Sequence, residues 1–469
     1  MTQEQMKRDI DALVARVQAV SGLTGGAVAM LRDGEVVLSH CFGYADVEQK
    51  TPITEETFFD IASCSKAFTA MTGAQAADAG VFDWDTPAVR YMPDYKMADE
   101  YITAHVTGRD MLSHRTGLPR HDFMRAKFVD DRADTVARIA YMDFSRGLRE
   151  KYQYCNQMFI AFGYLLERIT EKRWEDQVLS QIAQPLGMEM RMRGSDGGMV
   201  GLPYAKPYMT DGHRAVPTVL ATGAAVAPCG GIKTNLRSLV KWVRALSNGG
   251  VYGDGKRLCS EAQMRELLTP NTTIGMDPAD EREPLKTYSL GWQLTSYRGK
   301  ACASHGGAIN GFNSQVGFLP GTGCGYVVLV NTHGTPAYAV LRNYMLDLLT
   351  IGEAKDPQPL LDAWRKETDK TLCELAEIAA LPAPTEEEIS FLCGAYFHPT
   401  YDCFEIRRGA DGAELTYGLY TVRLGRAADG VWRGVYGGDE FGHLELTRDG
   451  NDLRLRNPDS ELKLQFVRQ

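Results

Sequence analysis

The alternation of apolar and polar positions divides the chain into helical, strand-like and irregular stretches. Apolar residues at helical spacing, from Ile10 to Val17, predict a helix over the first twenty residues. Two apolar runs then flank Arg32-Asp33-Gly34-Glu35. Because Asp-Gly between such runs is typical of a tight turn, this stretch predicts a β-hairpin.

The same kind of pattern predicts how the rest of the first 351 residues is built. The periodicity is mainly helical from about residue 134 to 188, and strand-like runs return between about 290 and 332. An apolar helical pattern follows and ends near Ile351. We therefore expect an α/β (α+β) fold, with one sheet built from both ends of residues 1–351 and a helical lobe inserted at roughly 85–230.

The last part of the chain has a different character. Residues 352–390 are charged and helical and are broken by Leu381-Pro382-Ala383-Pro384, which indicates a linker with its own helix. From 391 to 469, short alternating runs are separated by Asp-Gly, Tyr-Gly, Gly-Gly and Asn-Pro turns. Strands at this spacing predict a small all-β antiparallel barrel or sandwich.

Composition narrows the class of protein. The chain carries 51 Lys and Arg against 60 Asp and Glu, a net charge of −9, which argues against nucleic acid or an anionic membrane as partner. Apolar runs fall short of a transmembrane helix, and the N-terminal stretch has acidic residues and no signal-peptide pattern. Its ten cysteines show no C-x-x-C spacing. We expect reduced thiols in a cytoplasmic protein, with no metal site.

The stretch from Phe58 to Gly80 is the strongest candidate for chemistry. An apolar approach ends at Ala62 and leads into an alanine-rich helix that begins with Ser63-Cys64-Ser65-Lys66. Three residues apart in a helix means one turn apart on the same side, so the Lys66 amine can reach the Ser63 hydroxyl. A helix N-terminus also presents free N–H groups. A serine there can be deprotonated and can attack a carbonyl whose oxygen faces those donors.

S-x-x-K alone is weak evidence, because a chain of this length should contain about one by chance. The sequence holds two more, Ser238/Lys241 and Ser460/Lys463. The first lies inside an amphipathic helix past its first turn, and the second lies in a polar turn before a terminal strand. We interpret both as structural.

Tyr154-Cys155-Asn156 is the one Y-x-N in a chain with 21 tyrosines, and it lies where a loop enters a helix. A phenol near an ammonium can share its proton, so it can act as the base for a serine and then as the acid for a leaving group. Taken alone, the pattern fits equally a packed tyrosine followed by a helix-capping asparagine.

His305-Gly306-Gly307 is the one H-x-G, on a predicted strand before a glycine-rich turn. Paired glycines allow a ligand to lie against the strand backbone, and a nearby N–H could be a second oxyanion donor. A half-buried strand histidine is the more common explanation for His305 alone.

The order S-x-x-K, Y-x-N, H-x-G resembles the serine β-lactamase and penicillin-binding-protein superfamily. The class C-like serine hydrolases, with their DD-peptidase, D-aminopeptidase and esterase relatives, are the most similar. Flanking segments agree, namely LSHRTGLP, PLGM, CGGIKTN and HGGAINGFNSQVGFLP. The resemblance covers most of residues 10 to 350. It implies a mixed sheet flanked by helices and an all-helical lobe, with the site in the cleft between them.

The resemblance also implies a role for each matching residue. Ser63 would be the acylated nucleophile, Lys66 its partner amine and Tyr154 the general base or acid. The substrate would be bound by Asn156, His305, Gly306 and Gly307, and the backbone N–H groups of Ser63 and Ala308 would form the oxyanion hole. His305 stands where many relatives have the lysine of K-T-G, a departure typical of H-x-G peptidases and amidases. Residues 391–469 resemble the lipocalin-like barrel of some members.

We therefore expect a serine hydrolase without metal or cofactor that forms an acyl-enzyme on Ser63. Its substrate would be a small molecule or short peptide with an amide or ester bond, as for an aminopeptidase, amidase or esterase. Alternatives are a DD-carboxypeptidase or weak β-lactamase and, in another class, a penicillin-recognising or scaffold protein with little turnover. Whether the chain forms a homo-oligomer stays open.

Overall fold

The computed structural model of the protein describes residues 1–121, 130–193, 199, 201–219, 223–418, 420–436, 442–456 and 463–469. Within these residues, nine strands form the main sheet, and each neighbouring pair in it runs antiparallel. Their order across the sheet is β11 (Thr272–Met276), β12 (Leu285–Tyr288), β13 (Gln293–Tyr297), β14 (Lys300–Ile309), β15 (Phe312–Leu319), β16 (Cys324–Val330), β1 (Gly25–Arg32), β2 (Glu35–Asp46) and β3 (Thr51–Pro52).

The pairing of β1 with β16 joins the two ends of the first 351 residues, with Gly26 opposite Val330. This confirms that one sheet is built from both ends. The hairpin is confirmed as well, because Asp33 and Gly34 both have positive φ, 54° and 79°, between β1 and β2. Two residues with positive φ form the turn that matches the twist of a hairpin.

Helices cover both faces of the sheet. On one face α1 (Gln3–Ser21) and α12 (Ala337–Thr350) pack their apolar sides against alternate residues of β1 and β16. On the other face lie α2 (Ser65–Asp78) and α10 (Leu236–Ser247), whose Phe68 and Trp242 rings stack 4.3 Å apart. Unlike the amphipathic α1, α2 is buried on nearly all sides of its first three turns. The nucleophile candidate therefore lies at the start of the central helix of the core.

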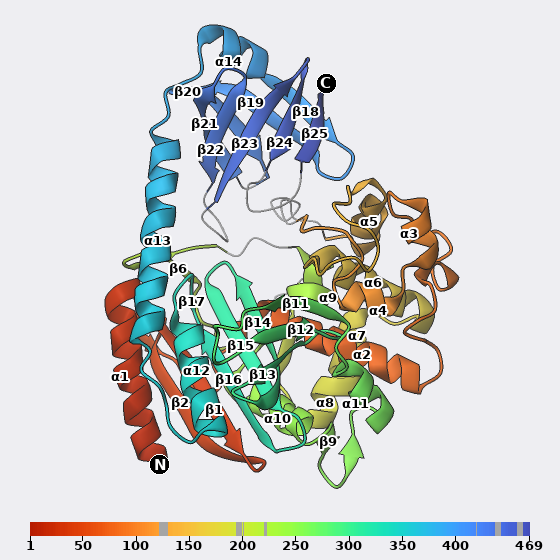
Figure 1. Ribbon diagram of the computed structural model, residues 1–469, viewed down its shortest axis with the longest axis vertical. Coiled ribbons are helices and arrows are strands. Elements are labelled where there is room, and N and C mark those ends of the chain that lie inside the picture. The colour runs from red at the N-terminus through yellow and green to blue at the C-terminus, as the bar shows by residue number, and fades with distance from the viewer. Residues whose placement is uncertain are drawn as a thin grey trace.

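The segment between β4 (Phe59–Asp60) and β8 (Ile232–Thr234) has several helices that gather to one side of the sheet, whereas its strand β6 (Tyr208–Thr210) lies on the opposite side, beside α13 (Gln358–Ala379) (Figure 1). Its largest helix is α6 (Asn156–Thr170). The shorter elements are η2 (Ala88–Arg90), α3 (Glu100–His105), α4 (Gly108–Leu112), α5 (Arg132–Ala137), η4 (Arg138–Tyr141), α7 (Trp174–Val178), η5 (Leu179–Ala183), α8 (Gln184–Leu186), β5 (Met190–Met192), β6 (Tyr208–Thr210), β7 (Ala215–Pro217), η6 (Ala224–Val226) and α9 (Ala227–Gly230).

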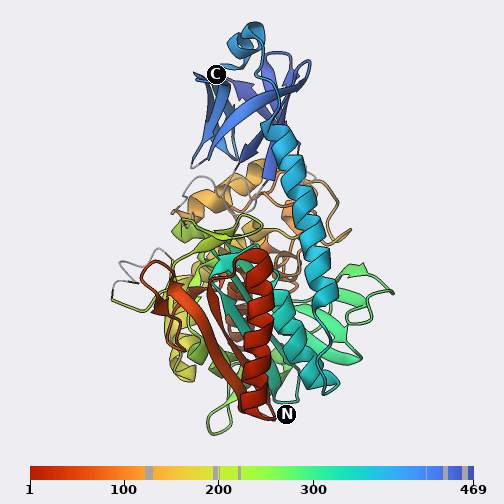
Figure 2. The same cartoon turned by 90° about the vertical axis from the view of Figure 1, so that its left-hand side faces the viewer.

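The remaining elements before the barrel are β9 (Val251–Tyr252), β10 (Lys256–Arg257), α11 (Glu261–Leu267), β17 (Thr332–His333), α13 (Gln358–Ala379) and α14 (Glu386–Leu392). Figures 1 and 2 show α13 as one long helix between the main sheet region and the barrel. Its first half packs on the sheet region, where Leu361 is buried in the core and Trp364 Nε1 donates to Gly334 O over 3.1 Å. At its other end, Arg423 of the barrel donates to Ala379 O over 3.0 Å.

Eight strands of the described C-terminal residues form a closed barrel, which confirms the predicted all-β module. They are β18 (Gly394–His398), β19 (Asp402–Gly409), β20 (Gly412–Tyr417), β21 (Tyr420–Ala428), β22 (Val431–Tyr436), β23 (Gly442–Asp449), β24 (Asp452–Arg456) and β25 (Lys463–Arg468). β18 and β25 close the barrel, with Tyr396 opposite Arg468. The division of the chain into domains at 351 and 390 stays a prediction.

The barrel docks on the helical lobe through the loop between β18 and β19. The Tyr401 hydroxyl lies 2.5 Å from His121 Nδ1, and Thr400 Oγ1 donates to Tyr141 O over 2.9 Å. Arg138 of the lobe forms an ion pair of 3.2 Å with Asp402. In the part of the chain that the structure describes, no helix has both the length and the apolarity needed to cross a bilayer.

Candidate active site

Ser63 lies in a short 3₁₀ turn, η1 (Ala62–Cys64), directly before α2. The predicted helix start is therefore confirmed with a small difference, since the regular α-helix begins two residues later. The turn is held from behind, because Ile61 N donates to Ile232 O over 3.0 Å. Ala62 has a φ of 45°, in the left-handed region that residues with a Cβ rarely adopt. The chain thus enters the nucleophile turn through a strained residue.

The Lys66 amine is fully buried and touches three acceptors. Nζ lies 3.0 Å from Ser63 Oγ, 2.8 Å from Asn156 Oδ1 and 2.7 Å from Cys229 O. An ammonium has three N–H donors, so this set matches its hydrogen-bonding capacity. The structure therefore brings together the serine and the lysine that the S-x-x-K spacing predicted.

Tyr154 reaches the same hydroxyl from the loop that precedes α6. Its hydroxyl oxygen lies 2.7 Å from Ser63 Oγ, and the Lys66 amine lies 4.8 Å from the centre of its ring. Ser63 and Tyr154 are both partly exposed, whereas Lys66 lies behind them. This geometry allows a proton to pass between the serine, the phenol and the amine.

The backbone around Tyr154 is fixed by His114. His114 O accepts from Gln153 N over 2.8 Å, and its Nδ1 accepts from Cys155 N over 3.1 Å. The imidazole ring also packs on the Tyr154 ring at 4.3 Å between centroids. Burial lowers the pKa of His114 well below its ordinary value, and the nearby Lys66 charge adds to this. A neutral His114 therefore serves as a support for Tyr154.

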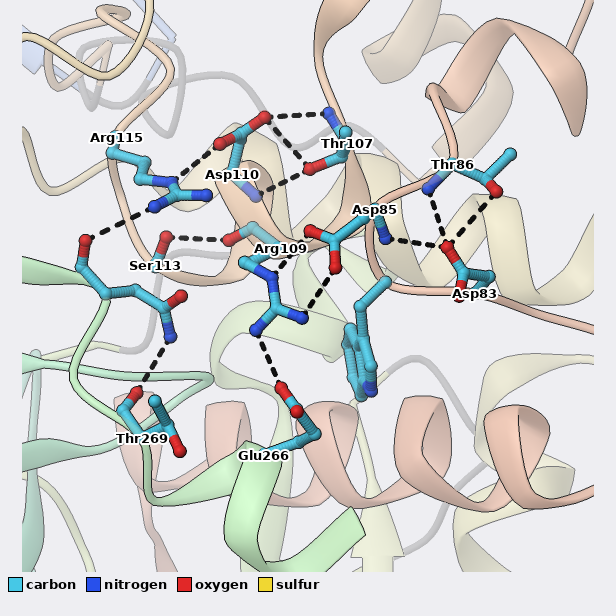
Figure 3. A network of polar contacts seen from close by, with 12 residues as sticks. Asp83, Asp85, Thr86, Thr107, Arg109, Asp110, Ser113, Arg115, Glu266 and Thr269 are labelled. Atoms are coloured by element: carbon cyan, nitrogen blue, oxygen red, sulfur yellow. Dashed lines mark hydrogen bonds and ion pairs between the residues drawn. The ribbon is translucent and has the colours of Figure 1, made fainter. Parts of the chain in front are cut away.

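A polar network in turn holds the segment that carries His114 (Figure 3). Asp110 accepts from Thr107 Oγ1 over 2.9 Å, from Arg115 Nε over 2.6 Å and from Arg149 Nη2 over 2.8 Å. Burial alone would raise the pKa of Asp110, but these hydrogen bonds and arginine charges hold it below its usual value. Arg115 follows His114 directly in the chain, and Arg149 lies shortly before Tyr154. The buried carboxylate of Asp110 therefore holds the segment that carries His114 against the segment that leads to Tyr154.

His305 lies on β14, is 2% exposed and uses both ring nitrogens inside the protein. Nδ1 lies 2.7 Å from Gly306 O, and Nε2 lies 2.7 Å from the Tyr288 hydroxyl. Because a carbonyl oxygen only accepts, Nδ1 carries the proton and Nε2 accepts from Tyr288. Burial, helped by the Lys66 charge, lowers the pKa of His305 to about 3. His305 is thus a neutral group at the position where many relatives have lysine.

Gly307 is needed where β14 passes the nucleophile turn. A Cβ at this position would lie 2.1 Å from Ile61 O and 2.3 Å from Ser314 Oγ. Ser314 Oγ also donates to Ile61 O over 2.7 Å. The absence of a side chain therefore lets the strand and the turn approach one another.

The edge of β14 is open beside Ser63. Its pairing with β13 ends at Ser304, whereas its pairing with β15 continues to Ile309. Residues 305–309 thus overhang β13, and His305 to Ile309 line a pocket of about 480 Å³ that also contains Ser63, Tyr154 and Asn156. A substrate carbonyl in this pocket would lie between the helix start and the strand edge. These are the places of the two predicted oxyanion donors, Ser63 and Ala308.

The other sequence candidates fall outside this arrangement. Ser238 Oγ accepts from Glu189 N over 2.8 Å, and Lys241 is bound to Gly187 O, so this S-x-x-K is structural as expected. Ser460 lies outside the described residues. Cys64 packs its thiol 3.1 Å from His305 O, and burial raises its pKa to about 12.

Several residues in or behind the pocket were not predicted from the sequence, among them His114, Arg120, Tyr152 and Tyr288. His114 lies in LSHRTGLP, which was noted for its family resemblance and not for any contact. The two tyrosines carry no local motif, so only the folded chain brings them to the pocket.

Comparison with known proteins gives the family. The Beta-lactamase family model matches residues 10–350, and the chain belongs to this family. The protein is a serine hydrolase of the β-lactamase-related type, as its family and its hydrolase and aminopeptidase relatives show.

Two relatives illustrate the range of activities. The unguisins hydrolase ungD' of Aspergillus campestris is 28% identical over 404 residues, which cover 81% of this chain and 73% of that protein. The D-aminopeptidase of Gluconobacter oxydans is 29% identical over 326 residues, which cover 65% of this chain and 56% of that protein.

Two solved structures share the fold. The octameric penicillin-binding protein homologue from Pyrococcus abyssi has a TM-score of 0.65 at 19% identity, over 98% of this chain and 99% of that one. The D-amino acid amidase from Ochrobactrum anthropi SV3 has a TM-score of 0.56 at 22% identity, over 70% of this chain and 90% of that one. The first likeness covers nearly the whole chain and therefore reaches into the C-terminal barrel region.

Proposed function

We propose that the protein hydrolyses an amide or ester bond of a small molecule or short peptide through an acyl-enzyme on Ser63. One observation carries this proposal: Ser63 Oγ lies within hydrogen-bonding distance of both Lys66 Nζ and the Tyr154 hydroxyl. A serine hydroxyl in contact with two groups that can exchange its proton is an activated nucleophile.

The reaction follows from these contacts. Ser63 Oγ attacks the carbonyl carbon while its proton passes to the Tyr154–Lys66 pair. The oxyanion is stabilised by the N–H groups of Ser63 and Ala308. The C–N or C–O bond then breaks, the pair returns the proton to the leaving group, and an ester to Ser63 remains. Water attacks this ester and gives a proton to the same pair. The pair passes the proton to Ser63 Oγ as the bond between Oγ and the acyl carbon breaks, so that the acid and the free serine are released.

The remaining predicted residues have supporting roles in this proposal. Asn156 orients the Lys66 amine through Oδ1 and lies in the pocket, where its amide can meet the substrate. Gly306 and Gly307 leave the strand backbone accessible to the substrate. His305, whose two nitrogens are engaged with Tyr288 and Gly306, acts by holding this strand and by shaping the pocket wall.

The substrate class is supported by the names of the relatives. Several act on amides or peptides, and two of them, the D-aminopeptidase and the D-amino acid amidase, are named for D-configured substrates. We therefore propose an amide or short peptide as the substrate, with D-configured residues to be tested first.

The test uses an active-site label. A fluorophosphonate should modify one residue per chain, on the peptide that contains Ser63, and Ser63→Ala should lose both labelling and turnover of p-nitrophenyl esters and of D- and L-aminoacyl anilides. Ser238→Ala is the matched control, because its S-x-x-K is structural, and it should keep both. Labelling of Ser63→Ala at the wild-type rate would overturn the proposal.

Two features of the whole protein are also proposals. A cytoplasmic location is supported by ten cysteines that are all free thiols. A homo-oligomer is supported by the octameric structural neighbour. Cell fractionation and light scattering of the purified protein test these two points.

A further inference from the structure

The described part of the pocket wall has a charge opposite to that of the chain. The protein carries a net charge of −9, yet none of the described residues that line the pocket is Asp or Glu. Arg120 lies in the pocket wall, and the Lys66 amine lies directly behind Ser63. A cleft lined by one sign of charge concentrates ligands of the other sign. The described wall therefore favours an anionic substrate group.

Arg120 is close to the reacting atoms. Its guanidinium carbon lies 5.1 Å from the centre of the Tyr154 ring, and the hydroxyl of the same ring contacts Ser63 Oγ. Its charge is also one of the effects that lower the pKa of His114. One phenol ring thus separates the guanidinium from the nucleophile.

The backbone that delivers Arg120 is anchored on both sides. Leu118 and His121 are fully buried, although the arginine side chain itself is exposed at the pocket. His121 Nδ1 contacts the Tyr401 hydroxyl of the barrel at 2.5 Å, and Gln157 Nε2 donates to His121 O over 3.1 Å. A side chain held on a fixed backbone can select a substrate group by position as well as by charge.

We propose that Arg120 binds a carboxylate on the substrate, so that the enzyme prefers amides and peptides with an anionic group near the scissile carbonyl over those that present a free ammonium. This rests on the proposed function of Ser63. A guanidinium has five N–H donors and can bind a carboxylate through two parallel hydrogen bonds while it keeps other contacts. An ammonium at the same place would meet the charges of Arg120 and Lys66.

The test compares rigid substrates that differ in charge alone. One set carries the charge on the leaving group, as butyryl esters of 3-hydroxybenzoate, 3-hydroxybenzamide and 3-(aminomethyl)phenol. The other carries it on the acyl group, as p-nitrophenyl phenylacetates with a 4-carboxylate, 4-carboxamide or 4-aminomethyl substituent. For the intact enzyme, kcat/KM should be roughly tenfold or more higher for the anionic member than for the neutral one in at least one set.

Variants assign this preference to Arg120. Arg120→Gln should abolish the preference, so that kcat/KM becomes equal for the anionic and the neutral substrate. Arg120→Lys should keep part of the preference, because lysine retains the charge but not the paired donors. Raising the salt concentration should reduce the wild-type ratio. Arg168→Gln, an exposed arginine on α6 that pairs with Asp94, is the matched control and should keep the ratio.

Equal kcat/KM for the three charge states in both sets would overturn the proposal, and so would a preference for the cationic members. A loss of equal size for all substrates in Arg120→Gln would do the same, since it would mean a structural role. Failure of the proposed function has a separate signature, because Ser63→Ala would then hydrolyse the neutral esters at the wild-type rate.

Discussion

At the scale of single residues, the position of Lys66 explains how a lysine can work inside a protein core. Its amine is fully buried but has an acceptor for each of its three donors, one of them the nucleophile itself. A buried amine without such partners would be strongly disfavoured. The same contacts place its charge next to the Tyr154 ring, and the Lys66 amine and the Tyr154 hydroxyl both contact Ser63 Oγ.

Tyr154→Phe removes the hydroxyl that contacts Ser63 but keeps the ring that packs on His114. We expect kcat to fall by about a hundredfold or more, which is the scale of general acid–base catalysis, with little change in the free energy of unfolding. Steady-state kinetics on a p-nitrophenyl ester and urea unfolding give the two quantities. Tyr164→Phe, on α6, is the control. Near-normal turnover by Tyr154→Phe would show that the tyrosine has a packing role only.

His305 predicts a pH dependence of stability. The folded protein keeps this imidazole neutral down to a pKa of about 3, whereas a histidine in the unfolded chain is protonated below about pH 6.5. Between these pH values the unfolded state binds more protons, so the free energy of unfolding should decrease as the pH falls from about 6.5 towards 3. The buried His114 acts in the same direction.

The measurement is urea unfolding at several pH values between about 4 and 7.5. His305→Gln should show a weaker fall in the free energy of unfolding towards acid than the wild type, and the exposed His213→Gln should keep the wild-type slope. If His305→Gln had the wild-type slope as well, another group would be responsible for the acid sensitivity.

At the scale of elements, the site depends on how closely β14 approaches the turn before α2. Gly307→Ala should destabilise the protein by about 1–3 kcal/mol, the usual range for overpacking, because a Cβ there would meet Ile61 O and Ser314 Oγ. It should also slow the labelling of Ser63, since any relief of the clash moves the nucleophile turn. Gly275→Ala on β11 is the control, because its Cβ would meet no atom within 4 Å. Equal stability of the two variants would contradict this prediction.

Elements that are specified by local sequence were predicted well. The helix α1 and the β1–β2 hairpin follow from apolar spacing and from Asp33-Gly34. The barrel was predicted from seven alternating runs, but its first strand, β18, was missed. This strand is only five residues long, and its sequence alone does not distinguish it from a loop. Its pairing with β19 and β25 identifies it as a strand.

The site was predictable where residues share a short motif and not where they meet only in the fold. Ser63 and Lys66 are one helical turn apart, so their contact follows from the sequence. Arg120 is more than fifty residues from Ser63 in the chain and carries no motif of its own. Its place beside the Tyr154 ring depends on how the lobe folds back on α6, which apolar periodicity does not encode.

At the scale of the whole molecule, the barrel contacts the chain segment that carries a residue of the pocket wall. Tyr401 of the barrel contacts His121, which is the neighbour of Arg120 in the chain. The Tyr417 hydroxyl donates to Tyr401 O over 2.9 Å and so fixes this loop to the barrel wall. The barrel can therefore influence the pocket without supplying a reacting group.

Tyr401→Phe tests this connection. We expect the variant to keep the hydrolysis of a small neutral ester but to change the ratio of anionic to neutral kcat/KM several-fold, because the segment that carries Arg120 loses one anchor. The free energy of unfolding should fall by about 1 kcal/mol for the lost hydrogen bond. Tyr420→Phe, elsewhere on the barrel, is the control. An unchanged ratio would limit the barrel to a role in stability or assembly.

The left-handed Ala62 has a consequence for how this enzyme could be made more stable. A glycine tolerates a φ of 45° without the cost that a Cβ imposes, which is about 1–2 kcal/mol. Ala62→Gly should therefore raise the midpoint of thermal unfolding, measured by calorimetry, while the freer backbone lowers the rate at which Ser63 is acylated. Selection for heat resistance alone would favour this substitution, and selection for turnover would remove it. The residue before the nucleophile is thus a point at which durability and reactivity compete.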